Sequence, residues 1–270
     1  MLTVVRSVGF RDSGRLRYPD GFRHRMAGVD ALRRDLLDSI RRLGKPGGDP
    51  RAQKYLGSPY PVLGLSSPQM KGIVSAFARA HRTFDPTTVN ALADSLWRGR
   101  VLEEMWAGIA ILSRYHKRWD EASWRIVDRW ADDAVGWGLC DALASGPIAD
   151  MVYGEPDRFR AVLRWTHAKS FWRRRISTYA MRAFVRAGEL DKPFEVLERL
   201  LYDSEFWVQR AVGTWLRECW KKDERRTAAF LRKRARGLPP VTITVATERA
   251  PKRFREELRR RARGGAGREA

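Results

Sequence analysis

A repeat of about 35 residues constrains the fold of this chain more than any other feature of its sequence. Residues 169–175 match residues 204–210 at a shift of 35 (204 − 169), with Phe and Trp at equivalent places. The same shift carries Trp137 onto Trp172 (172 − 137). A period of this length that is filled by two helices is typical of α-helical solenoids, in which each unit buries its apolar face only by stacking on its neighbours.

Apolar residues recur at helical spacing through most of the chain, whereas the alternation typical of strands is almost absent. Breakers such as residues 44–48 (Gly-Lys-Pro-Gly-Gly) separate the helical stretches, and Ser67 before Pro68 marks a helix start. The short run 241–245, which follows two prolines, is interpreted as an extended loop. The spacing predicts one helix that starts near Ser67 and others over residues 30–43, 86–97, 102–115, 121–130, 137–151, 156–165, 171–186, 193–201, 205–220 and 225–236.

The short connections between these stretches predict antiparallel helix pairs. We therefore expect an all-α fold, a right-handed superhelical solenoid of HEAT-like helix pairs whose concave face is basic and carries the functional site. We expect a flexible N-terminal extension over residues 1–27, one repeat domain over residues 28–262 and a disordered tail over residues 263–270.

The charge of the chain favours a polyanionic partner. Lys and Arg number 53 against 32 Asp and Glu, which gives a formal net charge of +21. Each phosphate that a Lys or Arg neutralises releases condensed counterions, so such a surface favours nucleic acid. The strongest local bias follows residue 220, and Lys252 and Arg253 begin a basic stretch there at helical spacing, which suits phosphate contact. The alternative is a basic protein without such a partner, because an Arg-rich composition also reflects a GC-rich genome.

Other classes of protein find little support in the sequence. Cys140 and Cys219 lie inside apolar helical patterns, which favours buried free thiols in a reducing compartment. No apolar run reaches the ~20 residues that span a bilayer, and residues 1–26 lack the apolar stretch of a signal peptide. We expect a soluble, cytoplasmic and nucleoid-associated protein with no membrane partner. The histidines and cysteines show no metal-ligand spacing, so we expect neither a metal nor an organic cofactor.

The repeat can bring an indole, a carboxylate and a guanidinium onto one surface. Trp137 and Asp141 stand four residues apart and therefore share a helix face. One repeat later Trp172 and Arg175 share a face at a spacing of three. The stacked helices could then place these side chains on one patch of the concave surface. The alternative is structural, because Trp at repeating positions more often belongs to a core.

Three motifs, taken together, identify a related family. The first is Lys-Tyr-Leu followed by Val-Leu-Gly-Leu-Ser-Ser-Pro within residues 54–68, and the second is Trp-x-x-x-Asp at residues 137–141. The third is Phe-Trp-x-x-Arg, which occurs at residues 171–175 and again at residues 206–210, where Ala-Val-Gly follows. In these motifs the chain resembles the AlkD-like DNA alkylation-repair glycosylases, which are HEAT-like solenoids. The likeness spans roughly residues 30–260.

The resemblance implies a catalytic set in which Trp137, Asp141 and Arg175 match the family's positions. The family's fourth residue is a Trp, but this chain has Thr214 there, and its own tryptophan is displaced to Trp215. Because a step of one residue rotates a side chain by about 100° around a helix, Trp215 cannot take that place. The replacement of the family's Trp by Thr214 therefore bears on which substrates the protein accepts and on whether it is active.

The resemblance also implies the reaction, the removal of alkylated purines from double-stranded DNA. A purine alkylated at N3 or N7 is cationic, and its loss builds positive charge on the deoxyribose. Asp141 would stabilise that charge and position water, Trp137 would attract the cationic nucleotide, and Arg175 would hold a backbone phosphate. The family is thought to work without drawing the base into a deep pocket, unlike base-flipping glycosylases. We expect a monomer, because one duplex would fill one groove.

The remaining expected DNA contacts follow from the same motifs and from the basic C-terminal stretch. Trp207 occupies a family aromatic position and could supply the missing ring. Two alternatives to a glycosylase stay open, namely a DNA-binding relative without the chemistry and a HEAT-type protein-interaction scaffold. The side chains expected to bind DNA are Trp172, Arg173, Arg174, Trp207, Arg210, Thr214, Lys252 and Arg253.

Overall fold

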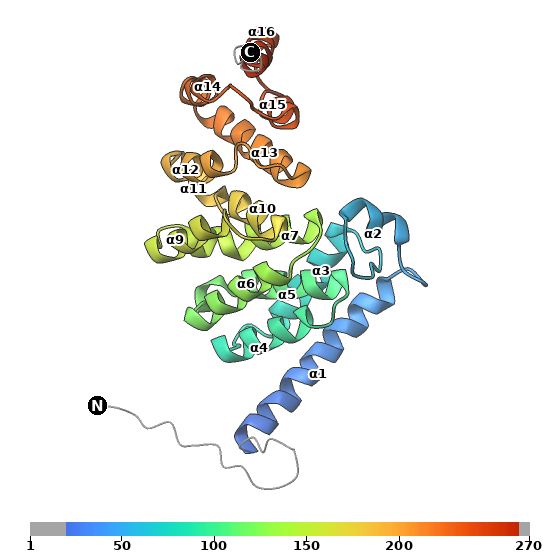
Figure 1. The fold of residues 1–270 in the computed structure, drawn as a ribbon. Coiled ribbons are helices and arrows are strands. Elements are labelled where there is room, and N and C mark those ends of the chain that lie inside the picture. Colours follow the sequence, from blue (N-terminus) through green and yellow to red (C-terminus); the bar gives the residue numbers. More distant parts are fainter. Residues whose placement is uncertain (1–19, 265–270) are drawn as a thin grey trace, which may run out of the picture.

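The computed structural model describes residues 20–264, which form helices and connecting segments and contain no strand (Figure 1). The helices stack in two layers. The layer drawn on the left in Figure 1 contains α4 (Pro86–Trp97), α6 (Glu121–Asp133), α9 (Pro156–Trp165), α12 (Asp191–Arg199) and α14 (Glu224–Lys233). The second layer contains α5 (Leu102–Arg114), α7 (Trp137–Leu143), α10 (Phe171–Tyr179), α13 (Phe206–Lys222) and α15 (Pro240–Ala246). The ends of the stack are formed by α1 (Asp20–Leu43) with α3 (Ser67–Ala80), and by α16 (Lys252–Arg263).

Corresponding helices begin 35 residues apart. In the first layer α6, α9 and α12 begin at Glu121, Pro156 and Asp191 (156 − 121 and 191 − 156). In the second layer α10 and α13 begin at Phe171 and Phe206 (206 − 171), the first residues of the repeated Phe-Trp motif. The predicted all-α solenoid is therefore confirmed, while its handedness and a basic concave face stay predictions.

Capping residues explain why several helix boundaries follow from the sequence. The Asp85 carboxylate accepts a hydrogen bond from the Thr88 amide at 3.0 Å, and Pro86 opens α4. Such a cap satisfies an amide that has no partner within the helix, and proline is pre-set for the first turn. The predicted ranges 86–97 and 156–165 coincide with α4 and α9.

The interpretation of residues 241–245 as an extended loop is wrong, because these residues belong to α15. Their β-branched side chains favour strand locally, but Ile243 and Ala246 are buried against the neighbouring helices. The packing of α15 on α13 is close: a Cβ added at Gly213 would lie 2.7 Å from the Val245 Cβ. Tertiary packing thus decides the conformation of this segment.

Other boundaries differ where the backbone is interrupted. The predicted helix over residues 137–151 breaks at Gly146, whose φ and ψ leave the helical region before Pro147. A π-helical segment, Ala144–Ile148, bridges the interruption, and α8 (Ala149–Val152) continues beyond it.

Two further differences concern the N-terminal part of the chain and the segment that follows α10. The predicted helix over residues 171–186 is divided into α10 and α11 (Arg182–Ala187). α1 begins ten residues earlier than predicted (30 − 20), and α2 (Pro50–Leu56) is not among the predicted helices. Most of the expected N-terminal extension and tail lies outside the described residues.

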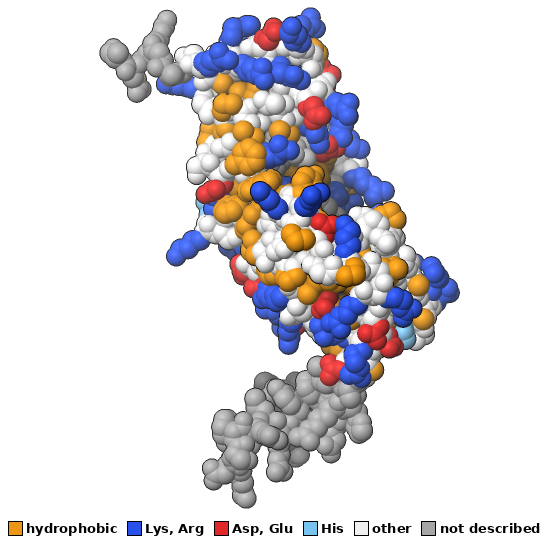
Figure 2. Space-filling view, turned by 90° about the vertical axis from the view of Figure 1, so that its right-hand side faces the viewer, with side chains coloured by type: hydrophobic (Ala, Val, Ile, Leu, Met, Phe, Trp, Pro, Cys, Tyr) orange, Lys and Arg blue, Asp and Glu red, His pale blue; other side chains and the backbone are white. Residues whose placement is uncertain are grey.

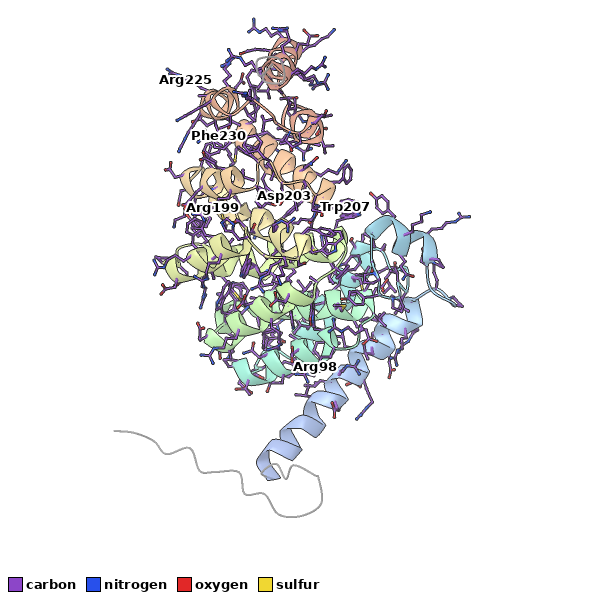
Figure 3. The ribbon with its side chains drawn as sticks, viewed as in Figure 1. Arg98, Arg199, Asp203, Trp207, Arg225 and Phe230 are labelled. Carbon is purple, nitrogen blue, oxygen red and sulfur yellow. The ribbon has the colours of Figure 1, made fainter. Side chains whose placement is uncertain are left out.

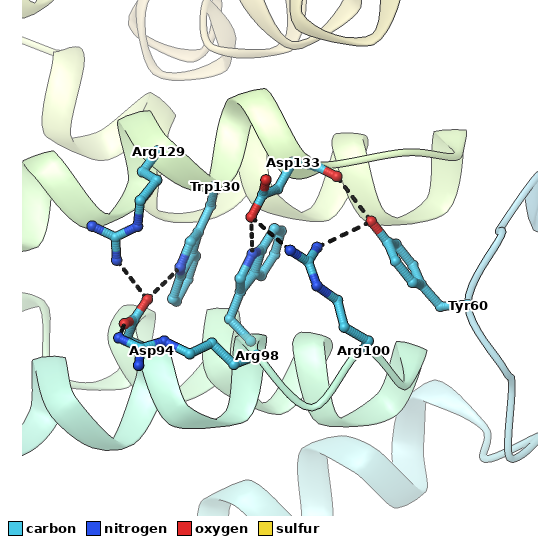
Figure 4. Close-up of polar contacts among 8 residues, drawn as sticks. Tyr60, Asp94, Arg98, Arg100, Arg129, Trp130 and Asp133 are labelled. Carbon is cyan, nitrogen blue, oxygen red and sulfur yellow. Dashed lines mark hydrogen bonds and ion pairs between the residues drawn. The ribbon is translucent and has the colours of Figure 1, made fainter. Parts of the chain in front are cut away.

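The core between α4 and α6 contains two stacked indoles with their polar edges satisfied (Figure 4). The rings of Trp97 and Trp130 lie 4.6 Å apart at an angle of 7°. Trp130 Nε1 donates to Asp94 at 3.0 Å, and Arg129 and Arg98 neutralise the same carboxylate. Buried polar groups of this kind are stable only when they are paired.

The same core is tied to the segment that follows α2. Trp97 Nε1 donates to Asp133 at 3.3 Å, and Arg100 pairs with that carboxylate at 3.1 Å. The Tyr60 hydroxyl donates to the Asp133 carbonyl at 2.9 Å (Figure 4). This network fixes the chain after α2 against α6.

Both cysteines are buried and free, as predicted. Within residues 20–264, no helix combines the length and the apolar character that a membrane span requires.

A buried carboxylate holds the segment that leads into α3. Glu103, on α5, is fully buried and accepts hydrogen bonds from the amides of Leu63, Gly64 and Leu65 at 2.9, 2.8 and 3.3 Å. A charged acceptor makes stronger hydrogen bonds than a neutral one, and its loss would leave three amides without this partner.

Glu103→Ala should lower the free energy of unfolding by about 2–4 kcal/mol, because it leaves amides unsatisfied in the interior. Urea unfolding followed by circular dichroism measures the loss. Glu121→Ala is the control, since that exposed carboxylate makes only ion pairs at 3.7 Å and should shift stability by less than ~0.5 kcal/mol. Equal unfolding midpoints for the two variants would contradict this account of Glu103.

Candidate functional site

A pocket of about 420 Å³ opens where α2, α7, α10 and α13 meet. Figure 3 shows Trp207 at the end of α13 that faces α2. In the space-filling view of this side, hydrophobic side chains gather in the middle, and Lys and Arg side chains lie around them (Figure 2). The predicted site residues that line the pocket are Trp137, Asp141, Arg175, Trp207, Arg210 and Thr214.

An ion pair between adjacent repeats forms the polar part of the pocket. Arg175 Nε donates to Asp141 Oδ1 and Arg175 Nη2 donates to Asp141 Oδ2, both at 2.8 Å. The side chain of Arg175 is 5% exposed and that of Asp141 is 20% exposed. The bidentate geometry fixes the carboxylate plane while leaving part of the carboxylate open to the pocket.

Burial raises the pKa of Asp141 above its ordinary value, and the ion pair with Arg175 opposes that rise. Burial, together with the neighbouring Asp141 carboxylate, also raises the pKa of Tyr179, so the phenol stays protonated at neutral pH. The pocket therefore contains a partly desolvated acid that is paired with a guanidinium, and the neutral hydroxyl of Tyr179.

The guanidinium of Arg175 is hydrogen-bonded to several groups of the protein. Besides its bonds to Asp141, it donates to the Trp207 carbonyl at 2.6 Å and to the Tyr179 hydroxyl at 3.1 Å. Its guanidinium carbon lies 4.9 Å from the centre of the Tyr179 ring. Four of the five guanidinium N–H groups are thus used inside the protein. This arrangement suits the positioning of Asp141 better than the phosphate contact that the sequence predicts.

Aromatic rings stand on both sides of α10. On one side Trp137 Nε1 donates to the Tyr55 carbonyl at 2.7 Å, and the two rings meet edge to face with centroids 5.2 Å apart. On the other side Phe206 and Trp207 meet at 5.3 Å, also edge to face. Tyr55 is 72% exposed and Phe206 is 48% exposed, so apolar surface is left open at the mouth of the pocket.

Two glycines allow α2 to approach the start of α7. Gly136 precedes α7 with a φ of +92°, and a Cβ added there would lie 2.6 Å from the Gly57 carbonyl oxygen. Gly57 ends α2 in the left-handed conformation. This approach places Tyr55 against Trp137, although 82 residues separate them in sequence.

The described residues contain no group of three or more His, Cys, Asp or Glu side chains that could hold a metal ion.

Comparison with known families places the chain among DNA alkylation repair proteins. Residues 36–250 match the model of the family described as "DNA alkylation repair enzyme". The chain belongs to this family. In fold it is similar to a protein named "Predicted DNA alkylation repair enzyme from Enterococcus faecalis", with a TM-score of 0.68 and 14% identity over 77% of this chain and 97% of that one. The search among curated proteins finds no match.

Thr214 departs from the pattern that the family resemblance implies. Thr214 lines the pocket, where the resemblance leads one to expect a Trp. The displaced Trp215 is buried in the core of the C-terminal repeats, edge-on to Tyr179 at 5.4 Å. Trp207 lies two helical turns before Thr214 on the same face of α13, and both residues line the pocket.

The pocket is not lined by three predicted DNA contacts on α10, namely Trp172, Arg173 and Arg174. Trp172 is buried behind Trp207, with centroids 5.9 Å apart. Arg173 forms ion pairs with two carboxylates of α6, Asp128 and Asp132. Arg173 is thereby neutralised within the protein.

The other predicted basic residues lie on three different helices, α10, α13 and α16. Arg174 pairs with Asp203 at 2.6 Å and is neutralised there, whereas Arg210 is exposed at the pocket and lies 5.8 Å from the Phe206 ring centre. Lys252 and Arg253 are exposed in the first turn of α16, the last described helix of the stack. A role in DNA binding stays a prediction for all of them.

Three pocket residues are not among the predicted site residues, namely Tyr55, Tyr179 and Phe206. Phe206 could have been predicted from the repeat, because it stands 35 residues after Phe171 (206 − 171). Tyr179 could have been predicted from helical spacing, because it lies four residues after Arg175 and therefore on the same helix face. Tyr55 belongs to one of the family motifs, but only the contact between α2 and α7 brings it to the site.

Gly136→Ala should destabilise the protein and push α2 with Tyr55 away from Trp137. The cost should exceed that of Gly188→Ala by at least about 2 kcal/mol, because only the former places a Cβ against a backbone oxygen. Gly188 has a φ of +83° but open space around it, so its substitution should cost about 1–2 kcal/mol. Urea unfolding and DNA affinity measure the difference, and equal losses for the two variants would contradict the close-approach argument.

Proposed function

We propose that this protein is a DNA glycosylase that excises N3- or N7-alkylated purines from duplex DNA. The observation that carries the proposal is the Asp141 carboxylate, held by Arg175 and partly exposed within an aromatic-walled pocket. An ion pair that served stability alone would not need to open onto aromatic rings at the surface.

The chemistry needs stabilisation of positive charge. When the glycosidic bond breaks, its electron pair neutralises the cationic purine, which leaves without needing a proton. The deoxyribose becomes oxocarbenium-like at C1′, and water then adds there and loses a proton. A fixed carboxylate stabilises that charge as it develops, because it needs no reorganisation at the moment of reaction. Asp141 supplies this carboxylate.

The aromatic walls suit a cationic substrate. Indole and phenol faces attract cations by about 0.5–2 kcal/mol, depending on exposure. Trp137 and Trp207 lie on opposite sides of α10 and offer such faces to a nucleotide that carries positive charge. An undamaged purine is neutral and gains less from the same contacts.

The two arginines of the pocket, Arg175 and Arg210, have different roles in this proposal. Arg175 orients Asp141, since its N–H groups are bound to that carboxylate and to the protein around it. Arg210 is exposed, and it supplies the positive charge that a DNA phosphate requires at the mouth of the pocket. Double-stranded DNA is thus the proposed partner.

Asp141→Asn should lower the single-turnover rate of purine release by about 100-fold or more, because the amide keeps the shape and loses the negative charge. DNA affinity should change little, since the carboxylate does not attract phosphate. Asp150→Asn, an exposed carboxylate paired with Arg182, is the control and should release purine at the wild-type rate. Salt-sensitive duplex binding by the wild type without any purine release would instead favour a DNA-binding protein that lacks the chemistry.

The pH profile gives a second test. The ionised carboxylate is the active form, and burial raises the pKa of Asp141 above the ordinary 3.8. The excision rate should therefore fall as the pH drops through this raised pKa, at a higher pH than an exposed aspartate would give. Single-turnover rates across the acid range measure this limb. A rate that stays constant down to pH 3.8 would exclude Asp141 as the titrating group.

A further inference from the structure

Tyr179 contacts the guanidinium of Arg175 in two ways. Its hydroxyl oxygen accepts a hydrogen bond from Arg175 Nη2 at 3.1 Å, and the centre of its ring lies 4.9 Å from the guanidinium carbon. The same Nη2 donates to Asp141 Oδ2 at 2.8 Å. A guanidinium that is held by a hydroxyl and by an aromatic ring together has little freedom to turn. Tyr179 therefore restricts the group that holds the carboxylate.

The hydroxyl of Tyr179 also acts on Asp141 itself. Because its oxygen accepts from Arg175, its own proton remains for another acceptor. Burial raises the pKa of Asp141, and hydrogen bonds with Arg175 and Tyr179 oppose that rise. The phenol thus stabilises the ionised carboxylate, which is the form that the proposed reaction needs.

Trp215 supports Tyr179 from the core. It is 6% exposed, and the two rings meet edge to face with centroids 5.4 Å apart and planes at 87°. Its Nε1 is buried and makes no hydrogen bond within residues 20–264. A buried N–H without a partner lowers stability, so the packing of the ring is what this indole contributes.

The contact between Trp215 and Tyr179 arises where the chain departs from the family pattern. The resemblance implies a Trp at the position of Thr214, which lines the pocket. A step of one residue turns a side chain by about 100° around a helix. The step moves the indole out of the pocket and into the core, against the ring that supports Arg175.

We propose that Tyr179 and Trp215 are positioning residues, which hold the Arg175 guanidinium in the orientation that presents Asp141 to the pocket. Trp215 packs on Tyr179, Tyr179 binds Arg175, and Arg175 binds the carboxylate. This inference rests on the glycosylase proposal for the reaction and adds how its carboxylate is held. It assigns no DNA contact to either residue.

The first test removes one hydroxyl and keeps the ring. Tyr179→Phe should lower the single-turnover rate of purine release by about three- to tenfold, because the carboxylate loses a hydrogen bond and is less firmly oriented. DNA affinity should stay unchanged. Tyr202→Phe is the matched control, because that hydroxyl donates to the Arg234 carbonyl at 2.8 Å and Tyr202 does not line the pocket. It should release purine at the wild-type rate.

The titration of Asp141 measures the same effect without any reaction. Loss of the Tyr179 hydroxyl removes one interaction that lowers the pKa of Asp141, so that pKa should rise. Carboxyl ¹³C chemical shifts followed against pH in the free protein measure it, and Asp141→Asn assigns the signal. The other titratable or charged side chains that face Asp141 or line its pocket are Arg175, Cys140, Tyr55 and Arg210.

A pair of core variants tests Trp215. Trp215 and Trp220 both lie on α13, each is 6% exposed, and Trp220 packs on Phe254 instead of Tyr179. Leucine at either position should destabilise the protein, but only Trp215→Leu should slow purine release, by about threefold or more. Circular dichroism at the assay temperature establishes that both variants are folded.

The outcomes separate this inference from the proposed function. Either an unchanged Asp141 titration or an unchanged excision rate in Tyr179→Phe would overturn the role of Tyr179. Equal excision rates for Trp215→Leu and Trp220→Leu would overturn the role of Trp215. A wild type that releases no purine would instead overturn the glycosylase, while the Asp141 titration in Tyr179→Phe would still show whether the phenol acts on the carboxylate.

Discussion

The ion pair between Asp141 and Arg175 is the interaction on which the site depends. It joins two successive repeats through α7 and α10, and a third repeat accepts a hydrogen bond from the same guanidinium through the Trp207 carbonyl. A buried charge is costly unless it is paired, so each partner requires the other. The pair thereby fixes a carboxylate that is partly open to the pocket. In the proposed reaction, this carboxylate is the charged group that opposes the developing cation.

The site is assembled from segments that are distant in sequence. The glycine contact between α2 and α7 brings Tyr55 to Trp137, and Glu103 and Asp133 hold the chain that follows α2. These contacts are ordinary fold-stabilising interactions, yet they determine one wall of the pocket. Since α7, α10 and α13 supply the other residues, the stability of the stack and the geometry of the site cannot be separated.

Much of this architecture follows from sequence patterns alone. The 35-residue repeat predicts stacked helix pairs, and the proline and aspartate at the start of α4 predict its boundary. The four-residue spacing of Trp137 and Asp141, together with the repeat, predicts that an acid and a guanidinium converge. In each case the pattern in the sequence predicts the same arrangement that the packing of the helices produces.

Other features have no local signal. The segment 241–245 is helical because Gly213 lets α15 approach α13, and its β-branched residues do not indicate this. The neutralisation of Arg173 depends on carboxylates of α6, and the burial of Arg175 depends on three repeats at once. Charge in the sequence therefore overstates how many arginines are available for phosphate. Such outcomes are set by partners that only the folded chain brings together.

The most direct test of the account is the analysis of products after purified protein acts on a duplex methylated at purines. Mass spectrometry of the small-molecule fraction detects released bases, and cleavage at abasic sites counts the sites left behind. The account predicts free methylated purine in an amount equal to the abasic sites. Intact methylated DNA after saturation of the duplex with protein would contradict it.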